Sequence, residues 1–379
     1  MIKSLKDFFR GLWVSGTPQF QHLQVEVTTR CDLPGCLMCP RRAWPERWLN
    51  HDLSWQNFER LIPALKLFTH VHLSGWGEPL LHPRLWNMAR VARSQGCSVS
   101  LTTNGMNLTE DVQMQVLEHL DMVAVSLDGT KAETYERLRP GADFQRVIQQ
   151  VGALCARKRA LGRPRPEVVL LFMKMQPNVA ELPEFLRLAA SLGVDRVNAT
   201  NLDFIAAPDM EGLTLVSSGP TQEIEAIMVQ AHRQAEKSSL PFRNVGATPV
   251  SDLLVCDANP LKNVFVTAFG NLAPCVYLGL PVSGDFSRHF FRKVFPVHNY
   301  FYGSIQAQEF SEINRQPAYQ EFTALFRSRV AANSSLIDQL VPNPQNLSPQ
   351  GSSSKDRPLS EPRFPWPPAC QGCYKSLGF

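Results

Sequence analysis

Residues 22–41, HLQVEVTTRCDLPGCLMCPR, join a short strand pattern to three closely spaced cysteines. In the first seven residues apolar and polar side chains alternate, which predicts a β-strand from His22 to Thr28. The cysteines follow in one loop, at Cys31, Cys36 and Cys39. Because barrel enzymes keep their chemistry at the carboxyl ends of their strands, this loop is in a catalytic position.

The same strand-then-helix pattern repeats along the chain about six times. Further strands are expected at 69–74, 98–103, 121–127, 167–174 and 194–200, and helices at 55–66, 84–95, 109–119, 143–159 and 179–192. Such alternation is typical of parallel α/β folds. Six units make a partial (β/α)6 TIM-like barrel rather than the full eight.

Composition sets broad limits on the protein. With 379 residues, 44% hydrophobic and 19% charged, the chain is long enough for one large core and a smaller appendage. The net charge is only +4, and the sequence lacks the dense basic stripe of a nucleic-acid-binding protein. No nucleic-acid partner is therefore expected. No run of 18 apolar residues and no signal peptide is found, so we expect a cytoplasmic protein without a transmembrane segment.

Nine cysteines in a reducing cytosol indicate metal or redox chemistry rather than disulfides. Three thiolates on a four-iron cluster would leave one iron open to bind another ligand. The same loop could instead hold zinc, with a fourth ligand such as His51 or His70. The isolated Cys97 and Cys155 are expected to be small buried hydrophobes.

The cysteine loop resembles that of the radical S-adenosylmethionine enzymes, whose hallmark is CxxxCxxC after the first barrel strand. This chain reads CxxxxCxxC, and the Pro34-Gly35 pair within the longer gap can turn the backbone and absorb one residue. The resemblance implies that a cluster with an open iron reductively cleaves S-adenosylmethionine. The 5'-deoxyadenosyl radical then abstracts a substrate hydrogen, and a reductant such as flavodoxin or ferredoxin supplies the electron.

Further segments resemble this family in the expected order: LSGWGEPLLHP after the second strand, LTTNGMNL after the third, VSLDG after the fourth, and then YERLRPG. By this resemblance the cosubstrate contacts are Gly77, Glu78, Pro79, Thr103, Asn104, Ser126, Asp128 and Arg139. Two further matches, Asn178 and Glu181, are also a common helix-cap pattern, and we interpret them as a cap. No catalytic residue is assigned beyond the cluster ligands.

A second cysteine set lies in the C-terminal part: Cys256, Cys275, Cys370 and Cys373. Its spacing resembles the twitch domain, a shortened SPASM domain that carries an auxiliary 4Fe-4S cluster. A hairpin at Gly270-Asn271 would bring the first two cysteines together. The alternative is that these four cysteines bind a zinc ion. With four thiolates no iron is open, so this second 4Fe-4S cluster would transfer electrons.

Three regions are therefore expected. They are an N-terminal extension (1–21) with a short amphipathic helix, the barrel (22–235), and a small auxiliary-cluster domain (236–379) with a flexible Pro/Ser-rich insertion at about 342–368. The predicted function is oxidative modification or maturation of a peptide, a cofactor precursor or a small alcohol. The alternative is a non-enzymatic iron-sulfur or zinc protein for electron transfer or scaffolding.

Overall fold

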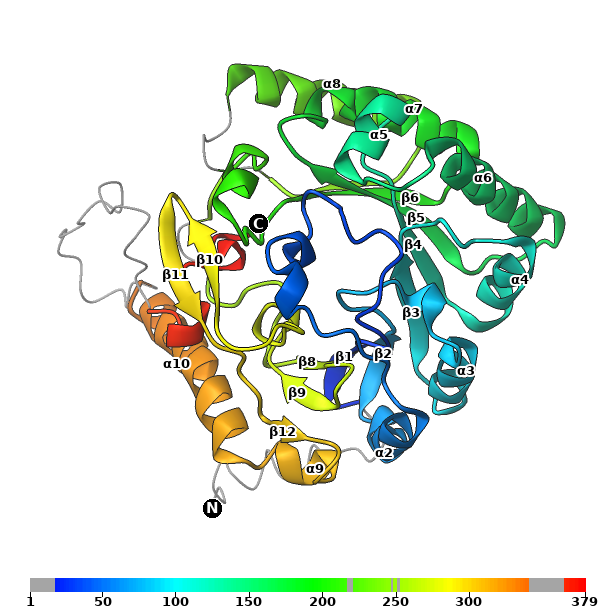
Figure 1. The fold of residues 1–379 in the computed structure, drawn as a ribbon. Coiled ribbons are helices and arrows are strands. Elements are labelled where there is room, and N and C mark those ends of the chain that lie inside the picture. Colours follow the sequence, from blue (N-terminus) through cyan, green and yellow to red (C-terminus); the bar gives the residue numbers. More distant parts are fainter. Residues whose placement is uncertain (1–17, 217–220, 247, 251–252, 341–364) are drawn as a thin grey trace, which may run out of the picture.

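A computed structural model describes residues 18–216, 221–246, 248–250, 253–340 and 365–379. Its main feature is a curved sheet of ten strands in the order β12-β9-β8-β1-β2-β3-β4-β5-β6-β7. Neighbouring strands from β8 through β1 to β7 are parallel. Figure 1 shows this sheet curving around the blue loop that follows β1, with the helices outside. The predicted partial TIM-like barrel is confirmed.

The six predicted strands and the five predicted helices are present, with their ends shifted by at most three residues. The strands are β1 (Phe20–Val25), β2 (Phe68–His72), β3 (Ser98–Thr103), β4 (Met122–Ser126), β5 (Glu167–Lys174) and β6 (Arg196–Asn201). The helices between them are α2 (Trp55–Leu65), α3 (Leu85–Ser94), α4 (Glu110–His119), α6 (Phe144–Ala160) and α7 (Leu182–Leu192). Local signals set several ends: Ser54 and Asp143 cap α2 and α6, and Gly193 ends α7 in the left-handed conformation.

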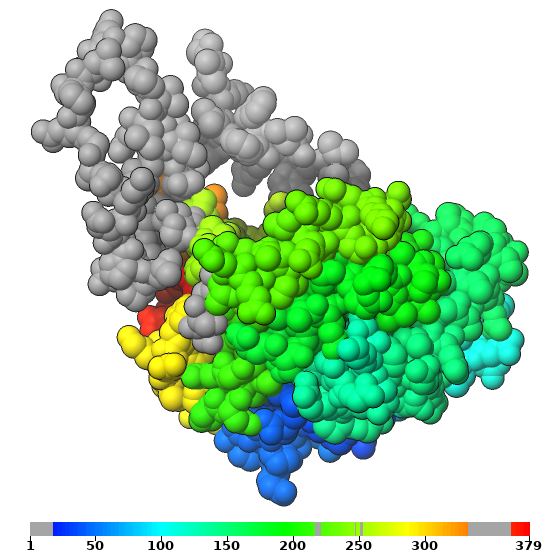
Figure 2. Space-filling model, turned by 90° about the horizontal axis from the view of Figure 1, so that it is seen from above, coloured from blue at the N-terminus to red at the C-terminus, as the bar shows by residue number. Residues whose placement is uncertain are grey.

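Further elements complete the fold. In the barrel they are α5 (Ala132–Leu138), α8 (Gln222–Lys237) and β7 (Phe242–Asn244). The C-terminal part adds β8 (Asn263–Val266), β9 (Asn271–Ala273), the hairpin β10 (Phe286–Phe290) and β11 (Lys293–Val297), β12 (Gly303–Ser304), α9 (Phe310–Ile313) and α10 (Pro317–Leu340). Short 3-10 turns complete the loops. In the space-filling view, the helices coloured teal to yellow-green form one continuous surface (Figure 2).

The C-terminal part joins the barrel's own sheet. Strand β8 pairs with β1 in parallel, His22 opposite Asn263, and β9 returns antiparallel to β8 as the predicted hairpin. The domain boundary at 235 stays a prediction. The predicted N-terminal helix lies outside the described residues, as does nearly all of the Pro/Ser-rich insertion. Within the described part of the chain, no helix is long and apolar enough to cross a bilayer.

The two faces of the strands differ in polarity. Residues facing the helices, such as Val71 and Leu101, are fully buried and apolar. The opposite face of β2 and β3 carries a hydrogen-bonded layer: His70 contacts Ser98 and Ser100 at 2.7 and 2.6 Å, and His72 contacts Ser100 at 2.7 Å. Burial lowers the pKa of His70 to about 4 and that of His72 to about 3. Both rings are therefore neutral inside the fold.

We predict that this layer makes stability fall with acid. The folded-state pKa values lie below the ordinary 6.5, so the contribution is complete above pH 6.5 and is lost progressively as the pH falls towards 4. Each ring changes the unfolding free energy by up to about 1 kcal/mol per pH unit. Denaturant unfolding at pH 7.5, 6.5 and 5.5 measures the unfolding free energy, which should fall less steeply with acid in His72→Asn than in the wild type. The exposed His232→Asn is the control, and equal slopes in all three proteins would refute the prediction.

Candidate active site

The first cysteine loop turns tightly around Leu33. The Leu33 backbone N–H lies 3.4 Å from Cys31 Sγ, and its carbonyl accepts a hydrogen bond from Cys36 Sγ at 3.3 Å. The additional residue of the CxxxxCxxC spacing lies within this turn. Burial raises the pKa of Cys31 to about 12 and that of Cys39 to about 11, and the nearby Cys36 sulfur contributes to both. The structure thus places the three predicted sulfurs close enough for Cys36 to affect the pKa of both other thiols.

Asp32, inside this loop, ties it to the turn after β3. Its two carboxylate oxygens accept hydrogen bonds from Asn104 Nδ2 at 2.6 Å and Asn107 Nδ2 at 2.7 Å. The sequence analysis assigned no role to Asp32 or Asn107. The TNG and CDLPGC segments could each be recognised alone, but nothing in the sequence indicated that they touch.

Glu78 is the centre of the predicted cosubstrate residues. Its carboxylate is buried and accepts hydrogen bonds from Thr103 Oγ1 at 2.8 Å, Asn104 N at 2.7 Å and Leu80 N at 3.1 Å. Burial raises the pKa of Glu78 to about 7, and these hydrogen bonds oppose the increase. The structure therefore joins Glu78, Pro79, Thr103 and Asn104 beside the cysteine loop.

The backbone packing around Gly77 leaves no room for a side chain. A Cβ there would lie 2.3 Å from the Thr28 carbonyl oxygen and 2.6 Å from that of Arg30. The next residue, Glu78, donates its backbone N–H to Arg30 O at 2.8 Å. The close approach that requires glycine is thus to the backbone of the cysteine loop.

Asp128 and Arg139 form a buried ion pair beside Cys36. Arg139 Nε and Nη2 each lie 2.7 Å from Asp128 Oδ2, and the Met173 backbone N–H donates to Asp128 Oδ1 at 2.7 Å. The pKa of Cys36 is raised by burial, and Arg139 opposes this increase. Ser126 lies at the end of β4, outside these contacts, and its role stays a prediction.

Asn178 and Glu181 occupy the N-cap positions of the 3-10 turn Val179–Glu181 and of α7, as the cap interpretation predicted, but neither side chain makes a capping hydrogen bond. The Asn178 amide instead donates to Asp128 O at 3.0 Å and Met173 O at 2.9 Å. Glu181 accepts hydrogen bonds from the Thr130 backbone and from the Thr130 and Thr134 hydroxyls at 2.6–2.8 Å. Both side chains therefore stabilise the loop that carries Asp128. The sequence pattern indicated only local hydrogen bonds at a helix start, whereas the folded chain supplies partners from this distant loop.

Glu26, which the sequence analysis missed, connects the site to the C-terminal part. It lies just after β1 and is fully buried, accepting hydrogen bonds from Trp76 N at 2.9 Å and Ala268 N at 3.1 Å. Burial raises its pKa to about 7. The one available signal was a carboxylate in an otherwise apolar and neutral strand pattern.

The second cysteine set meets around one cavity. Its lining includes all four predicted sulfur ligands, Cys256, Cys275, Cys370 and Cys373, together with Arg288, Tyr277 and Trp366. Backbone N–H groups of Ala258 and Asn259 point to Cys256, and that of Tyr277 points to Cys275. Burial raises the pKa of Cys256 to about 12. Residues more than a hundred positions apart thus contribute thiols to a single space.

Lys375 holds the three segments of this cavity together. Its Nζ lies 2.6 Å from Asp203 Oδ2 and 3.0 Å from Asp257 Oδ2. Asp203 follows β6, Asp257 follows Cys256, and Lys375 follows Cys373 by two residues. The Tyr277 hydroxyl also donates to Asp203 Oδ1 at 3.0 Å. The barrel therefore anchors the auxiliary cysteines directly.

Three aromatic rings fill the space between the two cysteine sets. Trp76, next to Gly77, lies with its ring centroid 5.7 Å from Phe204 and 6.0 Å from Tyr277. Phe204 and Tyr277 stack at 5.6 Å, and Trp76 Nε1 donates to Val276 O at 3.1 Å. Because Tyr277 also lines the cysteine cavity, these rings connect the Glu78 loop to it without a break.

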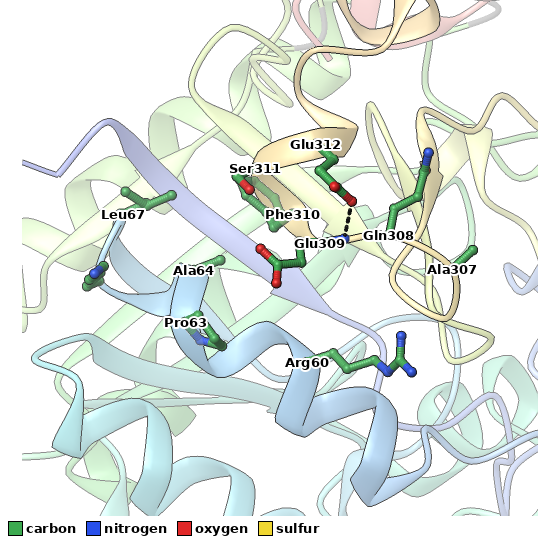
Figure 3. A pocket seen from close by; sticks show the side chains of 11 residues that line it. Arg60, Pro63, Ala64, Leu67, Ala307, Gln308, Glu309, Phe310, Ser311 and Glu312 are labelled. Atoms are coloured by element: carbon green, nitrogen blue, oxygen red, sulfur yellow. Dashed lines mark hydrogen bonds between the residues drawn. The ribbon is translucent and has the colours of Figure 1, made fainter.

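Another cavity lies outside the barrel, between α2 and α9 (Figure 3). Arg60, Pro63 and Leu67 line one side and residues 307–312 the other, and Glu312 accepts the Glu309 backbone N–H at 3.0 Å. Its volume of about 550 Å³ is typical of a small-molecule site. None of the predicted cluster or cosubstrate residues line it.

The fold and site define an α/β partial-barrel protein with clustered cysteines after its first strand and a buried carboxylate after its second. Residues 25–159 match the Radical SAM superfamily. This match covers the first cysteine loop and all of the predicted cosubstrate residues. It indicates an enzyme, favours the enzymatic hypothesis over the scaffold alternative, and implies S-adenosylmethionine and iron-sulfur chemistry.

The chain is similar to several characterised or named proteins. It is 23% identical over 313 residues, 80% of this chain and 83% of the relative, to the tungsten-containing aldehyde ferredoxin oxidoreductase cofactor-modifying protein of Pyrococcus furiosus. It is 25% identical over 268 residues, 68% and 83% of the two chains, to a probable GTP 3',8-cyclase of Saccharolobus islandicus. The crystal structure of Streptococcus suis SuiB bound to S-adenosylmethionine shares the fold, with a TM-score of 0.58 and 12% identity over 80% of this chain and 67% of SuiB.

We predict that Glu78→Gln weakens S-adenosylmethionine binding at least tenfold. The NH2 group of a glutamine would face another hydrogen-bond donor, either the Asn104 backbone N–H or the Thr103 hydroxyl. One unsatisfied buried donor costs about 1–3 kcal/mol. A tenfold change in affinity corresponds to about 1.4 kcal/mol. Equilibrium dialysis of anaerobically reconstituted protein measures it. The exposed Glu46→Gln serves as control, and unchanged affinity in Glu78→Gln would contradict the assignment.

Proposed function

We propose that the protein is an oxidative radical S-adenosylmethionine enzyme with two 4Fe-4S clusters. In this proposal Cys31, Cys36 and Cys39 hold the catalytic cluster. The auxiliary cluster is held by Cys256, Cys275, Cys370 and Cys373. The observation that carries the proposal is the single cavity into which these last four cysteines gather from three separate segments.

The donor set suits a cluster better than zinc. By number, four cysteine thiols could ligate either a structural zinc ion or a cubane cluster, and the Radical SAM match at residues 25–159 favours the cluster. In a cubane cluster each thiolate binds a different iron, so its sulfurs stand farther apart than those around one zinc ion. Backbone N–H groups directed at Cys256 and Cys275 further favour thiolates in this cavity.

The residues around the first loop suit S-adenosylmethionine. The Glu78 carboxylate is the right partner for an ammonium group and Arg139 for a carboxylate. Thr103, Asn104 and Leu80 hold the Glu78 side chain in one position. When bound, the catalytic cluster supplies the electron that cleaves S-adenosylmethionine, and the auxiliary cluster accepts an electron during substrate oxidation.

The aromatic bridge supports an electron-transfer role for the second site. Trp76, Phe204 and Tyr277 provide a path of contacting rings from the Glu78 loop to the cysteine cavity. Their positions are fixed, since Trp76 donates to Val276 O and Tyr277 to Asp203. A rigid path of this kind favours electron exchange between the sites.

For the substrate we propose a cofactor precursor or a peptide, ahead of a small alcohol. The relatives named above are a cofactor-modifying protein and a probable GTP cyclase, so maturation of a cofactor is the preferred role. A flavodoxin or ferredoxin is the proposed reductant.

We predict that the reconstituted enzyme forms 5'-deoxyadenosine from S-adenosylmethionine with dithionite under anaerobic conditions. Cys36→Ala should abolish the product, because a loop with two cysteines cannot hold the catalytic cluster. Cys97→Ala should retain it, because Cys97 is buried between Leu65 and Phe68 carbonyl groups. Mass spectrometry detects the product. Cluster-loaded wild-type enzyme that forms none would overturn the radical mechanism for this chain.

We predict that Cys275→Ala loses about half of the bound iron and retains 5'-deoxyadenosine formation. Only the auxiliary cavity loses a ligand, and the Glu78 and Cys31–Cys39 contacts are unchanged. Iron and sulfide analysis with Mössbauer spectroscopy measures cluster number. Equal iron in wild type and Cys275→Ala would refute the second cluster, while zinc at this site would show up in elemental analysis.

A further inference from the structure

The cavity of the four auxiliary cysteines contains two cations in different electrostatic states. Lys375 is paired with Asp203 and Asp257. Arg288, on β10, is only 3% exposed and forms no ion pair with any carboxylate of the described residues. A buried charge without an opposite charge is strongly destabilising. The fold therefore keeps an uncompensated positive charge beside four thiols.

The hydrogen bonds of Arg288 are also incomplete. Its Nη2 donates to the carbonyl of Ala369, the residue before Cys370. Its Nε is buried and has no partner among the described residues. Because buried donors are almost always satisfied, an unpaired N–H in a cavity lined by sulfur indicates an acceptor that belongs there.

We propose that Arg288 donates Nε–H to a sulfur of the auxiliary cluster and raises the reduction potential of that cluster. This inference rests on the proposed function. Four thiolates give the loaded site net negative charge, which supplies the missing counterion. Positive charge and N–H···S hydrogen bonds both stabilise the reduced form of an iron-sulfur cluster. Arg288 thereby makes the auxiliary cluster an acceptor of an electron from the substrate side.

The test is a redox titration of the auxiliary cluster followed by EPR. The full chain carries Cys31→Ala, Cys36→Ala and Cys39→Ala, so that only the auxiliary cluster contributes to the signal. Adding Arg288→Gln should lower the equilibrium constant for reduction of the cluster at least tenfold. The midpoint potential then becomes more negative by at least about 59 mV for one electron. Arg288→Lys should fall between this variant and the parent, because it keeps the charge but loses the Nε–H.

The matched control is Arg292→Gln. Arg292 lies in the same hairpin and loses the same charge, but it is exposed, so solvent screens it and the midpoint should stay at the parent value. A parent midpoint in cluster-loaded Arg288→Gln, or an equal shift in Arg292→Gln, would overturn the inference. If Arg288→Gln loses its cluster, Arg288→Lys decides, and a parent midpoint there overturns the inference. A parent protein without any cluster would instead refute the proposed auxiliary site.

Discussion

The buried carboxylate of Glu26 is the contact on which both halves of the protein depend. Removing a carboxylate from water is costly unless hydrogen bonds replace the lost solvent. Glu26 receives these bonds from Trp76 N, in the Glu78 loop, and from Ala268 N, in the β8–β9 turn. A Cβ on Gly75 would lie 2.4 Å from its side chain, so this loop must carry glycine to approach. One side chain thereby fixes the first cysteine loop, the cosubstrate loop and the C-terminal hairpin relative to one another.

The parallel pairing of β8 with β1 also attaches the C-terminal part to the barrel, through backbone hydrogen bonds. It makes the C-terminal part an extension of the barrel sheet, with a shared hydrophobic core. The auxiliary cysteines are then positioned by barrel residues, as Lys375 shows through its ion pair with Asp203. This anchoring supports the proposed electron transfer, because the path through Trp76 and Tyr277 keeps a constant length only if both of its ends are fixed.

Electrostatics distinguishes the two cysteine sites. At the first loop the charged groups are paired internally, Arg139 with Asp128, and Glu78 with backbone and hydroxyl donors. These pairs leave defined positions for a zwitterionic ligand. At the second site Arg288 remains uncompensated. These differences support the proposed division of roles, in which the first site binds S-adenosylmethionine and the second adjusts the potential of a cluster.

Local patterns in the sequence determined the six strand-helix units, the cysteine loop and the order of the cosubstrate motifs, because alternation, capping residues and Gly-Pro turns act over a few residues. They also located the β8–β9 hairpin at Gly270-Asn271. Tertiary structure alone decided that Asn178 braces Asp128 and that Gly77 faces the Arg30 backbone. It also decided that Arg288 faces the auxiliary cysteines. The physical reason is that these contacts join residues distant in the chain, and only packing determines which buried polar groups meet.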